Sequence, residues 1–142
     1  MAVGAFNVTL KKYFLSSRSS IKEKKGKTMN LEDEKFLRDI VNFIESKLDD
    51  ESLNPNSLVE FLRISKASLY ERLKKLTDRT PSEYIRYIRL EYASKLLCTT
   101  TLTVSEIIFK SGFSSKSYFY REFLKQYELS PKEFRSKYLK IE

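Results

Sequence analysis

Hydrogen-bonding and cationic side chains gather on one face of a predicted helix over 115–127. Phe119 and Phe123 lie four residues apart and Tyr127 follows one turn later, so these three predict the buried stripe of that helix. A turn at Gly112 separates it from a short apolar helix, which is the helix-turn-helix pattern. Side chains of these types can donate to base edges and phosphates. Those that point away from the stripe are Lys116, Ser117, Tyr120 and Arg121.

The same pattern occurs about fifty residues earlier, where 57–76 reads SLVEFLRISKASLYERLKKL. Leu69 and Leu73 take the places of Phe119 and Phe123. The chain is therefore expected to carry two DNA-reading helices. The residues predicted to face outward from the first of them are Lys66, Ala67, Tyr70, Glu71 and Lys74.

The net charge of +8 and a pI near 9.5 favour a nucleic acid or another anionic surface as partner, although a basic protein can also be merely well solvated. The charge is unevenly distributed. Residues 1–30 carry seven Lys/Arg against one Asp/Glu, residues 31–50 three against seven, and residues 51–142 seventeen against eleven. The acidic segment thus lies outside the twin motifs.

Several classes of function are disfavoured by what the chain contains. It has one cysteine, Cys98, and no histidine, so it offers neither an internal disulfide, nor a metal-ligand set, nor a nucleophile with a basic partner. Only three glycines are present, and none forms a phosphate-cradling loop. We therefore expect no catalytic site, no metal and no cofactor. No run of 18 apolar residues occurs and residues 1–10 lack the features of a signal peptide, so we expect no membrane partner and a cytoplasmic location.

The chain divides by composition into three parts. Residues 1–29 are rich in Lys and Ser and predict a flexible basic arm, residues 30–50 an acidic leading helix, and residues 51–142 the double helix-turn-helix domain. The expected fold is all-α, with helices over 31–48, 55–62, 65–76, 81–97, 104–110, 115–127 and 131–139.

Helix starts are marked by capping residues. All three prolines follow one, as Asn54-Pro55, Thr80-Pro81 and Ser130-Pro131. Ser65 and Ser115 are expected to cap the two reading helices, where a helix N-terminus also favours a phosphate. Capping boxes are predicted at Thr80–Glu83, Thr103–Glu106 and Ser130–Glu133.

The helix over 81–97 is apolar on several sides, which is typical of a helix buried between two bodies. We expect it to be a central strut of ~25 Å joining two helix-turn-helix subdomains. At that separation, the two reading helices could reach successive major grooves, about 34 Å apart. Two motifs in one chain make a monomer or weak dimer sufficient for binding.

Four ordered segments together resemble the DNA-binding domain of AraC/XylS-type transcription regulators. The resemblance implies homeodomain-like halves around a central helix, contacts with successive major grooves, and recruitment of RNA polymerase, usually for activation. The leading segment 33–50, DEKFLRDIVNFIESKLDD, is similar to the one preceding such domains in some hybrid two-component regulators. The four segments are SEYIRYIRLEYASKLL (82–97), LTVSEI (102–107), GFSSKSYFYREF (112–123) and LSPKEF (129–134).

The chain departs from this family's pattern at five positions. Arg63, Asp78 and Glu128 stand where glycine is usual, Ile108 where a small alanine is usual, and Ser111 where an apolar residue is usual. If Arg63 is left-handed, a non-glycine residue there costs about 1 kcal/mol. These departures and the acidic leading helix leave an alternative open, a protein-interaction module that keeps the fold without useful DNA affinity.

Individual roles follow from family position and side-chain chemistry. Ala67 could meet a thymine methyl, Glu71 could accept from cytosine N4, and Arg121 could fork onto guanine. Instead of a base contact, Glu71 could form an ion pair with Lys75 within the helix. Arg121 could instead contact a phosphate or pair with an acidic residue. Lys74 is expected to meet phosphate.

Overall fold

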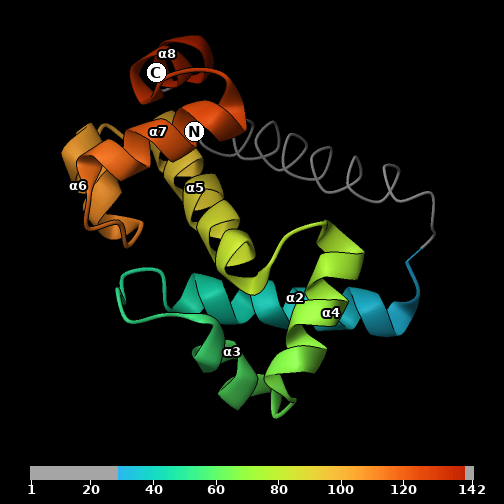
Figure 1. The fold of residues 1–142 in the computed structure, drawn as a ribbon. Helices are drawn as coiled ribbons and strands as arrows, with labels where there is room; N and C mark the ends of the chain where they lie inside the picture. Colours follow the sequence, from blue (N-terminus) through green and yellow to red (C-terminus); the bar gives the residue numbers. More distant parts are fainter. Residues whose placement is uncertain (1–28, 140–142) are drawn as a thin grey trace.

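The computed structural model describes residues 29–139 and contains, in this range, seven helices and no strand. The predicted arm falls almost entirely outside the described residues. α2–α4 form one half of the molecule, α6–α8 form the other, and α5 runs between them (Figure 1). The predicted all-α fold is confirmed, with every helix end within two residues of its expected place. The helices are α2 (Leu31–Ser46), α3 (Pro55–Leu62), α4 (Lys66–Thr77), α5 (Pro81–Thr99), α6 (Val104–Lys110), α7 (Lys116–Tyr127) and α8 (Pro131–Tyr138).

Each helix begins after a side chain that accepts a hydrogen bond from its first turn. The three predicted capping boxes all form. In the box of α5, the Thr80 amide donates to Glu83 Oε1 at 2.8 Å and the Glu83 amide donates to Thr80 Oγ1 at 3.2 Å. A fourth box, between Asn54 and Ser57, was not predicted, because serine replaces the usual Glu or Gln at its third position.

The core consists of two clusters that meet on α5. Tyr84 and Ile88, from its first half, pack in a cluster with α2, α3 and α4. Leu90 and Leu97, from its second half, pack in another with α6, α7 and α8. This confirms the predicted strut. Cys98 is fully buried in the second cluster, and burial raises the pKa of its thiol to about 12.

Three non-glycine residues end helices in the left-handed conformation. Arg63 has φ 55°, Asp78 has φ 62° and Glu128 has φ 59°, and they follow α3, α4 and α7 respectively. The condition stated for Arg63 is therefore met, and the same steric argument applies to Asp78 and Glu128 because their φ angles are also positive.

Phe61 of α3 is a large apolar residue that is not buried. Its side chain is 48% exposed and stacks on Phe43, with ring centroids 4.4 Å apart. The inward face of α3 is made by Leu58, Val59 and Leu62. Because successive residues turn by about 100°, Phe61 falls at the edge of that face.

Candidate nucleic-acid interface

The first of the two predicted reading faces lies on α4. Ser65 caps the helix, its Oγ accepting from the Ser68 amide at 3.0 Å. Leu69 and Leu73 are fully buried, which fixes the rotation of the helix about its axis. The opposite face is consequently exposed, with the Tyr70 side chain 49% accessible. The predicted residues exposed there are Lys66, Ala67, Tyr70, Glu71 and Lys74.

The second reading face lies on α7, in the other half of the molecule. Ser115 caps it, accepting from the Tyr118 amide at 3.2 Å. Phe119 and Phe123 are fully buried and pack against each other, with ring centroids 5.5 Å apart. The predicted residues exposed on the other side are Lys116, Ser117, Tyr120 and Arg121.

Glu122 is a residue that the sequence reasoning missed. It is 7% exposed and lies among three cations: Arg86 at 3.2 Å, Arg121 at 3.3 Å and Lys125 at 3.4 Å. Burial raises the pKa of Glu122, but these hydrogen bonds and charges lower it more, so it lies below the ordinary 4.5. The i,i+3 spacing of Glu122 and Lys125 was the one signal in the sequence.

Arg121 therefore has the acidic partner that was considered as an alternative to base contact. Its Nε donates to Glu122 Oε2, and its guanidinium lies 5.2 Å from the ring centre of Tyr118. The side chain is nevertheless 61% exposed, so a groove could still reach it. Tyr118 is in turn linked to the central helix, because its hydroxyl accepts from Arg86 Nη1 at 3.2 Å.

On α4 the corresponding alternative does not form. Among the described residues, no ion pair joins Glu71 to Lys75. Lys74 instead donates from Nζ to the main-chain carbonyl of Asp78 at 3.3 Å. This contact is solvent-exposed, so exchanging it for a phosphate requires little desolvation.

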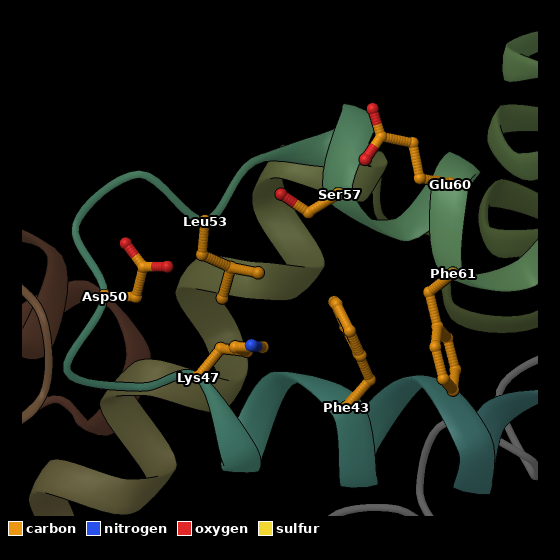
Figure 2. Close-up of a pocket in the computed structure, with 7 residues that line it drawn as sticks. All are labelled: Phe43, Lys47, Asp50, Leu53, Ser57, Glu60 and Phe61. Atoms are coloured by element: carbon orange, nitrogen blue, oxygen red, sulfur yellow. The ribbon is translucent and has the colours of Figure 1, made fainter.

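A surface pocket of about 390 Å³ lies in the first half, between the end of α2, the following loop and α3. Figure 2 shows the Phe43 and Phe61 rings side by side, with the charged residues spread around the hollow. None of the predicted reading residues lines it. The lining residues are Phe43, Lys47, Asp50, Leu53, Ser57, Glu60 and Phe61.

Residues 29–139 hold no group of three His, Cys, Asp or Glu side chains that could bind a metal ion. In that same part of the chain, no helix has the length and apolar character that crossing a bilayer requires.

Comparison with known proteins places this geometry in a family. The family of helix-turn-helix domains matches residues 58–137, which is more than half of the chain. The histidine kinase P4 of Formosa agariphila is 30% identical over 111 residues, 78% of this chain and 8% of that protein. The lactose operon transcription activator of Staphylococcus xylosus is 30% identical over 95 residues, 67% of this chain and 34% of that protein. The chain thus spans about a third or less of the length of these relatives.

Solved structures agree with the sequence comparison. The C-terminal domain of AraT, a response regulator from Geobacillus stearothermophilus, superposes with a TM-score of 0.66 at 27% identity, covering 75% of this chain and 88% of that one. The two capped reading helices, the buried strut and the matched sequence lead to one assignment. The chain belongs to the AraC/XylS-type helix-turn-helix family and has the fold of its DNA-binding transcription regulators.

Proposed function

We propose that this protein is a sequence-specific regulator of transcription that reads two successive major grooves of double-stranded DNA with α4 and α7. One observation carries the proposal. All nine residues expected to face DNA are exposed, on two helices whose opposite faces are fully buried. The same arrangement in both halves supports two units that read DNA, and family membership supports DNA as the ligand.

The length of α5 supports the two-groove arrangement. Its 19 residues correspond to about 28 Å at 1.5 Å per residue. Each half adds its own width to this distance, so the reading helices can serve grooves about one helical turn, or 34 Å, apart.

The side chains divide into those that read bases and those that position the protein. We assign base contacts to Ala67, Glu71 and Arg121, with a thymine methyl, a cytosine amine and a guanine as their respective partners. Tyr70 and Tyr120 extend from the same faces. Lys74 and the capped helix starts at Ser65 and Ser115 are assigned to phosphates.

The consequence for transcription is also part of the proposal. One relative bears the name of a transcription activator, which supports activation of transcription by this protein. The resemblance to AraC/XylS-type regulators implies that such activation occurs through recruitment of RNA polymerase. Two reading units in one chain let a monomer bind an asymmetric site.

Selection from a random duplex library tests the proposal. The selected site should contain two half-sites about one helical turn apart, and its affinity should fall steeply from about 50 to about 200 mM salt as phosphate contacts release counterions. A site only one half-site wide would reject two-groove reading.

The competing function is a protein-interaction module, and the pocket between α2 and α3 is the observation in its favour. Phe61 is half exposed beside a hollow of about 390 Å³. If the library yields no enriched sequence while the protein forms a stable complex with another protein, and Phe61→Ser abolishes that complex, the interaction module is the better description.

A further inference from the structure

Arg89 lies at the middle of α5, where the two core clusters meet. It is 6% exposed and stands between Ile88 of the first cluster and Leu90 of the second. Its guanidinium donates hydrogen bonds to three main-chain carbonyl groups.

These carbonyls come from both halves of the molecule. Nη1 donates to Leu48 O and to Ser111 O, the latter at 2.9 Å, and Nη2 donates to Asp50 O at 2.9 Å. Leu48 and Asp50 lie in the segment that joins α2 to α3, whereas Ser111 ends α6 in the turn before α7. A planar guanidinium fixes the directions of its donors, so one rigid group holds the two segments in register.

Gly112 shows how closely the two segments approach. It has φ +83°, and a Cβ placed on it would overlap both the Arg89 guanidinium and the Leu48 carbonyl oxygen. The turn of the second helix-turn-helix unit therefore contacts the backbone of the first half directly. Only glycine satisfies both the conformation and the space.

We propose that Arg89 is the positioning residue that sets the spacing and rotational phase of the two half-sites this protein accepts. The inference rests on the proposed two-groove reading. A shared helix keeps both halves on one axis, but each half could still rock against it. One extra base pair moves a half-site by about 3.4 Å and turns it by about 34°. The hydrogen bonds from Arg89 to carbonyls of both halves oppose relative movements of this size.

A series of DNA duplexes with altered half-site spacing tests the inference. The selected site is lengthened and shortened by one and two base pairs, and each duplex is titrated with wild type, Arg89→Met and Arg89→Lys. Wild type should lose about a hundredfold in affinity once the spacing prevents both units from binding together. Arg89→Met should reduce that loss to less than about tenfold, because loosened halves adjust to more spacings. Arg89→Lys, which cannot hold three coplanar acceptors, should give an intermediate profile.

Arg135→Met is the matched control. Arg135 of α8 also donates to two main-chain carbonyls, Leu97 O at 2.9 Å and Thr100 O at 3.2 Å, but these lie at the end of α5 that packs in the second cluster, so they join α8 to α5 without involving the first half. Its loss should lower stability and leave the spacing profile as steep as in wild type. Gly112→Ala is a second variant that keeps the Arg89 residue but should displace its guanidinium, because the added Cβ would overlap it, and it should likewise flatten the profile.

The possible outcomes distinguish failure of the Arg89 positioning role from failure of the proposed two-groove DNA binding. If wild type binds a two-part site with a sharp spacing optimum and both Arg89 variants keep that optimum, the positioning role is rejected. If wild type shows no two-part site, the proposed function itself fails. Affinity for a duplex with a single half-site should be the same in all variants, once each is normalised to its folded fraction.

Discussion

Arg121 and Lys74 are both exposed cations on reading helices, yet they are expected to behave differently. Arg121→Ala should remove discrimination at a single base pair of the selected site, by ~1–3 kcal/mol, because a forked guanidinium–guanine contact is lost. Lys74→Ala should weaken binding to all sequences alike and reduce the slope of log K against log salt by about one. Competition titrations on single-base variants of the site, repeated at several salt concentrations, measure both effects.

Lys132 is the control for this pair, because it is an exposed lysine on α8, a helix that carries none of the predicted reading residues. Lys132→Ala should change neither base discrimination nor, appreciably, the salt slope. Uniform weakening by Arg121→Ala, with base preference intact, would reassign Arg121 to phosphate.

The left-handed end of α7 gives a prediction on stability. Glu128→Gly should stabilise the fold by about 1 kcal/mol, because release of side-chain strain at φ 59° exceeds the entropy that glycine adds to the unfolded chain. Glu128→Ala retains a Cβ and should give no such gain. Urea unfolding of wild type and the two variants measures their free energies of unfolding. Equal stability of the glycine and alanine variants would contradict the prediction that strain at Glu128 lowers stability.

The burial or exposure of a side chain was predictable from the sequence where apolar residues recur at helical spacing. Leu69 and Phe119 are core because they repeat at helical spacing, and their neighbours on the opposite face are exposed for the same reason. The partners of Arg89 were not predictable. Carbonyls that become neighbours only through folding, such as those of Leu48 and Ser111, leave no side-chain signal in the sequence.

At the level of helices, local residue patterns predicted the number of helices in the described range and where each one begins. Capping residues and prolines act within a few residues of sequence, so helix starts are readable without tertiary information. Helix ends were less certain. α2 ends at Ser46, although the apolar stripe continues to Leu48. Leu48 lies in the loop after the helix, and its side chain is nevertheless buried in the core. Tertiary packing, rather than periodicity, decides such ends.

The anchoring of α7 to α5 through Glu122 makes stability depend on pH. Because the folded-state pKa of Glu122 lies below its ordinary 4.5, the ionised carboxylate stabilises the fold above that value. The contribution should vanish as pH falls through the folded pKa. Glu122→Gln should therefore cost ~1–2 kcal/mol at neutral pH, and this cost should shrink as pH falls through the folded pKa and the wild-type carboxylate becomes protonated.

Urea unfolding of wild type and Glu122→Gln over a series of pH values below neutral provides the measurement. The exposed Glu60→Gln is the control, because it makes the same chemical change at a residue that caps no helix. A difference between wild type and Glu122→Gln that stays constant with pH would mean that the side chain contributes through shape and not charge.

On the scale of the whole molecule, the sequence predicted two reading faces but not how firmly they are coupled. The central helix was evident from its apolar circumference. The joining of the halves at Arg89 and Gly112 was not, since it depends on two turns sixty residues apart meeting at the middle of α5. Pairing of distant turns is a property of the assembled fold.

The two reading faces should nevertheless contribute to binding independently. Tyr70 lies on α4 and Arg121 on α7, in separate halves of the molecule (Figure 1). Effects of distant substitutions add to within about 0.5 kcal/mol. The Tyr70→Ala/Arg121→Ala double variant should thus lose the sum of the free energies lost by the two single variants.

A double-mutant cycle of dissociation constants on the selected site measures this sum. The cycle formed by Arg121 and Tyr118 is the comparison, because the Arg121 guanidinium lies over the Tyr118 ring and a coupling energy is expected there. If Arg121→Ala had no effect once Tyr70 was replaced, the second unit would bind only after the first has engaged. The protein would then read its two grooves in sequence, with α4 setting the site and α7 testing it.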